Sequence, residues 1–230
     1  MIRKTCLLAS TKPWHRALWP TAENGEVLWI WVETPEELEL ELARNDHVRY
    51  VFFFHWHWKV PERIWNAWEC VCFHMTDLPY GRGGSPLQNL IRRGHRETKL
   101  TALRMEEELD AGPVYGKRPM SLEGSAEAIF HRSARLAFDL VDWMVREEPT
   151  PVAQEGQPVL FQRRTPAQSR LPEQGTLTGL YDFIRMLDAP TYPVAFLEHG
   201  EFMIELRNAQ LEGNELTATV RIRKTEDPDV

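Results

Sequence analysis

Residues 70–87, CVCFHMTDLPYGRGGSPL, hold the features that decide the fold. The segment begins as an apolar run typical of a buried strand, and His74, Thr76 and Asp77 stand where that strand should end. The glycine-rich YGRGG that follows can bring its backbone close to a ligand. A buried strand, a polar tip and a flexible loop in this order predict a functional site at the carboxyl end of a strand in an open sheet.

Segments with strand and helix patterns alternate on both sides of this stretch. Strands are predicted at 6–10, 26–32, 49–54, 70–75, 98–105 and 112–118, and helices at 34–46, 61–68, 85–94 and 125–148. The helix at 34–46 carries its own start signal, with Thr34 as N-cap, Pro35 at the first helical position and Glu37 three residues after the cap. This alternation predicts an α/β fold with a mostly parallel sheet and helices on both of its faces.

The composition changes after Pro149, where the long helix must end. Residues 1–150 are therefore predicted to form the main domain, and residues 151–230 a small α+β appendage. The appendage begins with an irregular strap that contains a short strand at 159–164, followed by a helix at 177–189. Two alternating segments within 201–224 are predicted to form a hairpin that turns at Gly213-Asn214.

Charge and cysteine content restrict the classes of substrate and the cellular location that the protein is expected to have. The 27 Lys and Arg against 34 Asp and Glu give a net charge of −7, which argues against a polyanion such as tRNA or DNA and favours small substrates. The three cysteines lie in apolar stretches and no signal segment opens the chain, so a cytoplasmic location is expected. No apolar run is long enough to span a membrane.

His74 at the strand tip is a candidate for acid–base chemistry. A single histidine on an apolar strand is often a core residue with its hydrogen bonds satisfied. A distant segment, MEEELDAGPVY at 105–115, offers Asp110 in an Asp-Ala-Gly turn, although such a turn is common without any function. A carboxylate delivered by a loop can orient an imidazole and make it more basic, so the two residues together predict a general acid–base pair.

These two segments together resemble the folate-dependent formyltransferases. That family carries Asn-x-His-x-Ser-Leu-Leu-Pro, then an Arg-Gly loop, and further along a Leu-Asp-x-Gly-Pro segment. The positions that match in this chain are His74, Leu78, Pro79, Arg82, Gly83, Pro86, Gln88, Gly94, Leu109, Asp110, Gly112 and Pro113. Two later segments, RRTPAQS at 163–169 and LYDFIRMLDAPTYPVAFL at 180–197, resemble the tail of the branch that formylates nucleotide-linked amino sugars.

The resemblance implies a Rossmann-like fold and an enzyme that uses 10-formyltetrahydrofolate as co-substrate, with no metal. The formyl group would pass to the amine of a UDP- or dTDP-linked deoxy-amino sugar in surface glycan biosynthesis. Formylation of methionyl-tRNA is the alternative within the family, and the net acidity and the short tail argue against it. A non-catalytic folate- or nucleotide-binding relative is the alternative from another class. The oligomeric state stays open, a homodimer included.

The resemblance also suggests residue roles. His74 would donate to the developing oxyanion or move a proton between amines, and Asp110 would hold the ring or accept the amine proton. Cys72 stands where the family has an asparagine that holds the formyl oxygen, so its role is expected to be mainly packing. The alternative is that Cys72 accepts the formyl group as a thioester, with His74 as its base. Thr76 replaces the family serine on the substrate side.

Three further sets of residues are candidates for binding. Trp56, Trp58 and Val60 would offer aromatic and apolar surface to a flat pterin, unless they are simply core residues, and the backbone of Glu106, Glu107 and Leu109 would meet its polar edge. Arg82, Gly83 and Gly84 would bind a substrate anion, with Ser10 and Lys12 near the diphosphate unless Lys12 is only solvated. His55, His57 and His74 lack a fourth ligand for a metal site.

Overall fold

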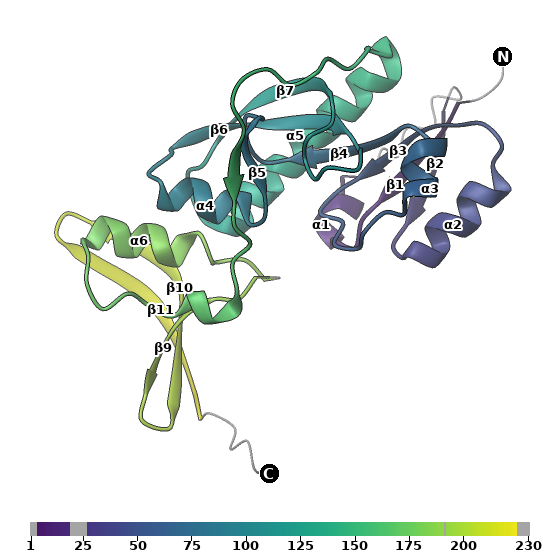
Figure 1. The fold of residues 1–230 in the computed structure, drawn as a ribbon. Helices are drawn as coiled ribbons and strands as arrows, with labels where there is room; N and C mark the ends of the chain where they lie inside the picture. The colour runs from purple at the N-terminus through teal and green to yellow at the C-terminus, as the bar shows by residue number, and fades with distance from the viewer. Residues whose placement is uncertain (1–3, 19–26, 191, 225–230) are drawn as a thin grey trace. The chain divides into compact units, whose positions relative to one another are not determined.

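The computed structural model describes residues 4–18, 27–190 and 192–224 (Figure 1). The chain divides into two compact units, each built from separate segments. The first unit contains the chain through Gly83 together with 98–120 and 131–160, and the second contains 84–97, 121–130 and the chain from Phe161 onward. The boundary at residue 150 stays a prediction. Glu26, the first residue of the second predicted strand, lies outside the described residues.

The first unit is organised around a six-stranded sheet with the strand order β2-β1-β3-β4-β6-β7. The strands are β1 Lys4–Ala9, β2 Val27–Val32, β3 Val48–Phe53, β4 Cys70–His74, β6 Glu97–Arg104 and β7 Val114–Ser121. The pairings β1–β2, β1–β3 and β3–β4 are parallel, whereas β4–β6 is antiparallel. The α/β prediction with a mostly parallel sheet is therefore confirmed.

Helices cover both faces of this sheet, as predicted. The helices of the first unit are α1 Pro13–Arg16, α2 Pro35–Arg44, α3 Glu62–Ala67 and most of α5 Ala126–Glu147. On one face, alternate strand residues such as Leu7 and Phe53 form a buried cluster with Leu38 of α2 and Ile64 of α3. On the other face, Phe54 stacks on Phe138 of α5 with ring centroids 5.0 Å apart.

The start of α2 is fixed locally. The hydroxyl of Thr34 accepts a hydrogen bond from the backbone N–H of Glu37 at 3.1 Å, and the Glu37 carboxylate accepts one from the backbone N–H of Glu33 at 2.7 Å. These bonds satisfy amides at the helix N-terminus, so the start signal predicted from the sequence is confirmed.

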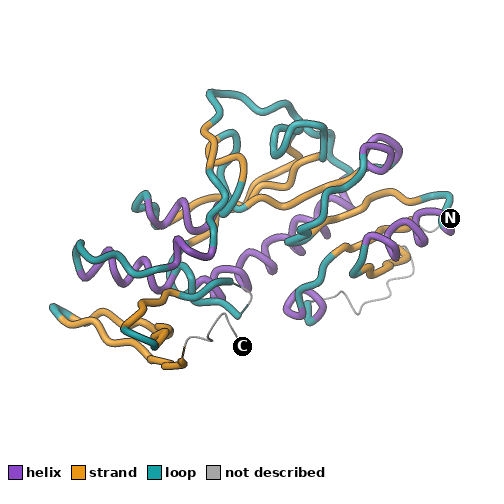
Figure 2. The backbone as a smooth tube through the Cα atoms, turned by 60° about the horizontal axis from the view of Figure 1, so that its bottom comes forward, coloured by secondary structure: helices purple, strands orange, loops and turns teal. Residues whose placement is uncertain are grey.

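The second unit contains a three-stranded antiparallel sheet of β9 Ala195–His199, β10 Phe202–Glu212 and β11 Glu215–Lys224, drawn in orange in Figure 2. The helix α6 Leu177–Arg185 packs on β10 and β11, and α4 Pro86–Arg92 packs on α6. The predicted hairpin turns at Gly213, whose φ is 56°. No sequence pattern predicted β9 or the 3-10 turn Pro166–Ser169.

The glycine-rich loop contains a short strand that the sequence did not reveal. This strand, β5 Tyr80–Gly83, pairs with β8 Val159–Phe161 in the strap after α5. The backbone N–H of Val159 donates to the carbonyl of Pro79 at 3.2 Å. The strap is thus hydrogen-bonded to the segment that follows His74, although the two are far apart in the sequence.

Candidate active site

His74 is the last residue of β4, at the carboxyl edge of the sheet. β4 is in register with β3 through Phe53 and Cys72 and with β6 through Thr101 and His74. Cys72 packs against the buried cluster on the α2 and α3 face, and strand alternation directs His74 to that same face. His74 is only 8% exposed. The strand therefore places the imidazole beside Cys72 in a largely dry environment.

Two backbone segments meet at the His74 ring. Its Nε2 lies 2.7 Å from the carbonyl oxygen of Gly81, and its Nδ1 lies 3.5 Å from Oδ2 of Asp110. The same Asp110 oxygen accepts a hydrogen bond from the backbone N–H of Gly83 at 2.9 Å. Asp110 has a φ of 56°, a left-handed conformation that Asp tolerates better than most residues. The predicted pair is thus brought together, and the glycine loop holds both partners.

The hydrogen-bond partners determine where His74 carries a proton. A carbonyl oxygen can only accept, so Nε2 donates to Gly81. In the neutral ring Nδ1 then has no proton and faces the Asp110 carboxylate across 3.5 Å. One additional proton fits between these two groups, because it converts the facing lone pairs into a charge-assisted hydrogen bond. The arrangement can accept a proton from a reacting group and return it.

Cys72 lies near Asp110 but is unsuited to act as a nucleophile. Burial, the Asp110 charge and the neighbouring Cys70 raise the pKa of the Cys72 thiol far above its ordinary value. A reactive cysteine requires a thiolate, which needs a lowered pKa and a positive environment. The raised pKa of Cys72 argues against the thioester alternative, and the packing role stays a prediction.

Thr76 and Asp77 continue the chain beyond β4 as structural anchors. The Thr76 hydroxyl lies 3.4 Å from the Gly81 carbonyl, and the Thr76 carbonyl accepts a bond from Thr101 at 2.6 Å. Asp77 forms ion pairs with Lys117 at 2.5 Å and with Lys99 at 2.9 Å. Burial acts to raise the pKa of Asp77, but the hydrogen bonds from the two lysines outweigh it and hold that pKa below the ordinary value.

Ser10 does not have the exposure that direct contact with a diphosphate requires. It is fully buried, its hydroxyl bonds Nδ1 of His15 at 2.7 Å, and it accepts a bond from the backbone N–H of Lys12 at 3.1 Å. Lys12 is half-buried, with its ammonium 5.9 Å from the centre of the Trp14 ring. In this structure the Ser10 hydroxyl holds the loop after β1, and the predicted place of Ser10 and Lys12 near a diphosphate stays a prediction.

The glycine loop is also less open than expected. The N–H of Gly83 is used by Asp110, and the N–H of Gly84 donates to the carbonyl of Phe161 at 3.1 Å. Arg82 bonds Oε1 of Gln154 through Nε at 3.1 Å and Nη2 at 3.0 Å, and its Nη1 pairs with Glu108 at 3.2 Å. Both amides donate within the chain in this structure, and a role of Arg82, Gly83 and Gly84 in binding a substrate anion stays a prediction.

The residues predicted to bind the pterin fall into two groups. Trp56 and Val60 belong to the apolar cluster between α2, α3 and the sheet or pack against it, and Trp56 meets Trp58 edge to face with centroids 4.7 Å apart. Trp56 and Trp58 are half-buried, so each still presents surface. In contrast, Glu106, Glu107 and Leu109 are exposed in the loop before Asp110. Their binding role stays a prediction.

Gln154 was not singled out from the sequence, because glutamine in an irregular strap carries no pattern. Its amide joins the Arg82 loop to the Asp110 turn, donating to the carbonyls of Asp110 and Gly112 at 2.8 Å each. His15 was missed for a similar reason. Its Nε2 lies 3.4 Å from Nδ1 of His55, and burial together with His55 and Lys12 lowers the pKa of His15 to about 2.

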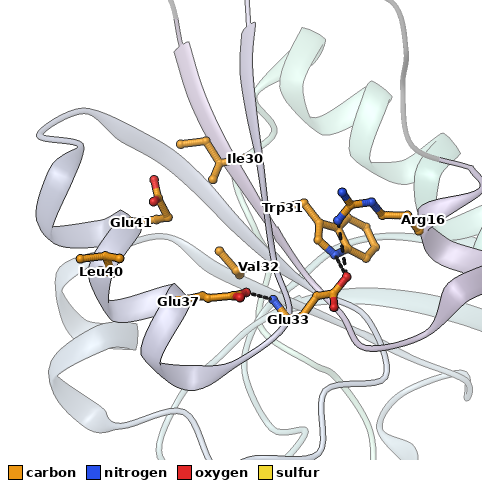
Figure 3. A pocket seen from close by; sticks show the side chains of 8 residues that line it. All are labelled: Arg16, Ile30, Trp31, Val32, Glu33, Glu37, Leu40 and Glu41. Atoms are coloured by element: carbon orange, nitrogen blue, oxygen red, sulfur yellow. Dashed lines mark hydrogen bonds and ion pairs between the residues drawn. The ribbon is translucent and has the colours of Figure 1, made fainter.

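A groove of about 520 Å³ lies on the first unit, between β2 and α2 (Figure 3). Figure 3 shows Arg16 and Trp31 converging on Glu33, which bonds both of them, at 3.4 Å and 2.9 Å. The groove contains none of the predicted site residues. In the described part of the chain, no group of three or more His, Cys, Asp or Glu side chains could hold a metal ion. Nor is any described helix long and apolar enough to cross a membrane.

Comparison with known proteins supports the resemblance. A family model for the C-terminal domain of methionyl-tRNA formyltransferase matches residues 166–223. A methionyl-tRNA formyltransferase from Methylococcus capsulatus is 29% identical over 168 residues, which cover 70% of this chain and 54% of that protein. The chain spans about half the length of the curated relatives it matches.

Solved structures are similar over more than nine-tenths of the chain. A methionyl-tRNA formyltransferase from Clostridium thermocellum superposes with a TM-score of 0.92 at 36% identity, covering 96% of this chain and 99% of that chain. A sugar N-formyltransferase from Shewanella sp. FDAARGOS_354 superposes with a TM-score of 0.68 at 15% identity, covering 91% of this chain and 99% of that chain, which shows only a common fold. This chain therefore belongs to the folate-dependent formyltransferase family, which includes the methionyl-tRNA formyltransferases.

Proposed function

We propose that this protein transfers the formyl group of 10-formyltetrahydrofolate to a primary amine, with His74 and Asp110 handling the proton. The observation that carries the proposal is the His74–Asp110 contact of 3.5 Å at the carboxyl edge of the sheet, with the ring and the carboxylate both held by the glycine loop. Open α/β sheets bind their ligands at this edge.

The residues present fit such a co-substrate. Trp56 and Trp58 are half-buried on the same side of the sheet as Cys72, and indole rings suit a flat pterin. When bound, 10-formyltetrahydrofolate supplies an electrophilic formyl carbon and a nitrogen that can leave. The chain supplies proton transfer: the amine loses a proton as its bond to the formyl carbon forms, and the His74–Asp110 pair takes that proton up. The pair then returns it to the departing nitrogen.

The acceptor best supported is methionyl-tRNA, the alternative in the sequence analysis. The family model and the C. thermocellum structure both carry that activity in their names. The sugar acceptor rested on local resemblance in the tail, and the sugar-modifying relative at 15% identity supports the fold alone. The comparisons thus support methionyl-tRNA better than the expected nucleotide-linked amino sugar, which remains as a competitor to be tested.

The net charge of −7 does not exclude a tRNA acceptor, because phosphate contacts need only a local basic surface. In the second unit, Arg92 and Arg163 are exposed, and Arg92 lies near enough to Arg164 to act on it electrostatically. Burial and the Arg92 charge lower the pKa of Arg164. The buried Nε of Arg164 has no hydrogen-bond partner among the described residues. The Arg92–Arg164 pair, with the exposed Arg163 next to Arg164 in the chain, favours a phosphate-rich acceptor.

In the deciding experiment, the purified protein is incubated with 10-formyltetrahydrofolate and either methionyl-tRNA or a panel of UDP- and dTDP-linked amino sugars. We expect N-formylmethionine to be recovered from the deacylated tRNA, and no formyl mass gain on any sugar nucleotide. A formyl gain on a sugar with none on methionyl-tRNA would contradict the tRNA assignment. No transfer to any acceptor would contradict the catalytic proposal and favour a folate-binding role.

The arginine contribution is tested by charge reversal. Arg163→Glu should raise the KM for methionyl-tRNA and reduce its dependence on salt, because fewer counterions are released on binding. The matched control is Arg135→Glu, an exposed arginine on α5 in the first unit. Equal changes in KM for both variants would assign the effect to net charge, and the local arginine surface would be rejected.

A further inference from the structure

The strap after α5 is attached to the first unit at a defined point. Val152 and Val114 form an isolated antiparallel bridge, with reciprocal backbone hydrogen bonds of 2.7 Å and 2.8 Å. Val114 is the first residue of β7, and Asp110 lies just before it in the chain. Gln154 is two residues beyond the bridge, so the bridge presents its side chain to the Asp110 turn.

The Gln154 amide uses its full hydrogen-bonding capacity. Nε2 donates to the carbonyls of Asp110 and Gly112, each at 2.8 Å, and Oε1 accepts from Nε and Nη2 of Arg82 at 3.1 Å and 3.0 Å. A glutamine has two N–H donors and one oxygen with two lone pairs, so all four sites are occupied. The partners fix the orientation of the amide, because a rotated amide would place N–H groups against the guanidinium and oxygen against the two carbonyls.

The two segments that Gln154 joins are those that position the proton-transfer pair. Arg82 lies between Gly81, whose carbonyl binds His74, and Gly83, whose N–H binds the Asp110 carboxylate. In the Asp110 turn, Gly112 is closely packed, since a Cβ there would lie 2.0 Å from the carbonyl oxygen of Arg104. The contacts among His74, the Arg82 loop, Gln154 and the Asp110 turn therefore form a closed ring. The distance between His74 and Asp110 in this ring depends on the Gln154 amide.

We propose that Gln154 is a positioning residue that sets the His74–Asp110 geometry by joining the Arg82 loop to the Asp110 turn. This inference rests on the proposed function, because the pair it positions is the proposed proton-transfer pair. Gln154 acts through Asp110 and His74 and does not touch the reacting atoms. A side chain with both an acceptor and two donors is required, so neither Glu nor Met can replace it.

Two Gln154 variants separate the acceptor and donor functions of the side-chain amide, and a variant at another glutamine provides a control. Gln154→Met removes the acceptor and the donors at similar length, whereas Gln154→Glu keeps the acceptor for Arg82 and loses both donors to the carbonyls of Asp110 and Gly112. The control is Gln157→Met, the same change at an exposed glutamine of the same strap. We expect Gln154→Met to lower kcat by about 10²-fold, the typical effect of a misplacement of ~1 Å, with little change in the KM for the formyl donor.

Two results distinguish positioning from a general structural role. In an Asp110→Asn background, Gln154→Met should lower kcat by less than about threefold, because the partner through which it acts is already lost. In Gln154→Glu, activity relative to Gln154→Met should rise as the pH falls, because a protonated Glu can donate one of the lost hydrogen bonds. An equal loss in both backgrounds, or a constant ratio of the two variants across pH, would overturn the proposal.

A measurement without catalysis keeps this inference separate from the proposed function. In protein labelled with ¹⁵N-histidine, the His74 ring signals, assigned with His74→Asn, report the contact with Asp110. Gln154→Met should shift these signals in the same direction as Asp110→Asn, and Gln157→Met should leave them in place. If the wild type formylates no acceptor, the function fails but the NMR result still decides the position of His74. Unchanged His74 signals in Gln154→Met would refute the positioning role.

Discussion

Replacing Asp110 by asparagine removes the carboxylate charge while keeping the shape of the site. The Asn oxygen can still accept the Gly83 N–H bond of 2.9 Å, and Asn tolerates the φ of 56° about as well as Asp. The neutral amide cannot take up a proton together with His74. We therefore expect kcat to fall by about 10²–10⁴-fold, which is the usual contribution of a positioned acid or base to the rate. The melting temperature should be nearly unchanged.

Asp110→Ala provides the contrast, because it removes both function and structural support. The lost charge-assisted hydrogen bond to Gly83 costs about 1.5–3 kcal/mol. Alanine in the left-handed region costs about 1–2 kcal/mol more. For a chain of this size each kcal/mol lowers the melting temperature by about 2–4 °C, so Asp110→Ala should lower it by about 5–20 °C.

The assay is single-turnover formyl transfer with excess enzyme, followed by quenching and mass analysis of the acceptor, alongside thermal unfolding of each variant. Asp46→Asn, at an exposed position after α2, is the control for loss of one negative charge. If Asp110→Asn keeps more than about a tenth of wild-type turnover, Asp110 has no proton-transfer role. If Asp110→Ala is as stable as Asp110→Asn, the stability argument fails.

Three further predictions address neighbouring features. His74→Asn should cut turnover by about 10²–10⁴-fold, whereas Cys72→Ala should change it by less than about tenfold; a formyl adduct on wild-type Cys72 by intact-mass analysis would reverse these roles. The salt-bridged Asp77 has a lowered pKa in the folded protein, so its stabilisation is present above the unfolded value near 3.8 and is lost as the pH falls through the lower folded pKa. Thermal unfolding of wild type and Asp77→Asn should therefore differ at neutral pH and converge as the pH falls below 3.8, and a difference that stays constant as the pH falls would contradict this. Thr34→Ala should destabilise the protein by about 0.5–2 kcal/mol in denaturant unfolding, while Thr34→Ser should cost little, because the capping oxygen is retained.

The family assignment and the contact between His74 and Asp110 were both accessible from the sequence, whereas the comparisons favour the acceptor that the sequence analysis kept as its alternative. His74 and Asp110 could be predicted because each lies in a short motif at the end of a strand or in a turn. The sugar acceptor was predicted from resemblance in the tail, and tRNA was disfavoured by net charge, a property of the whole chain that says nothing about where arginines lie. Arg164 is adjacent to Arg163 in the sequence, but only the fold of the second unit brings Arg92 near Arg164, so no local pattern identified that pair.

The availability of backbone amides also depended on the fold. Gly83 and Gly84 have the composition of an anion-binding loop, and from the sequence their N–H groups should be free for a ligand. In the structure Asp110 and Phe161 use those groups. Whether a glycine amide is available depends on which distant acceptor reaches it, and a local sequence cannot show this.

The sequence by itself determined the features that depend on neighbours within a few residues. The capped start of α2 at Thr34, the alternation of strands and helices, the polar tip at His74 and the turn at Gly213 are all of this kind. Their physical causes are local, since they come from side-chain periodicity, capping hydrogen bonds and backbone conformational preference.

Only the tertiary structure decided the features that join residues far apart in the chain. The antiparallel direction of β6 beside β4, the pairing of β5 with the strap, and the Gln154 amide are of this second kind. Gln154 is 72 residues from Arg82 and 44 from Asp110. Such contacts form only when folding excludes water, so that buried polar groups must hydrogen-bond with one another. The partner of each group is therefore the group that lies nearest in the folded structure, and the neighbouring sequence does not identify it.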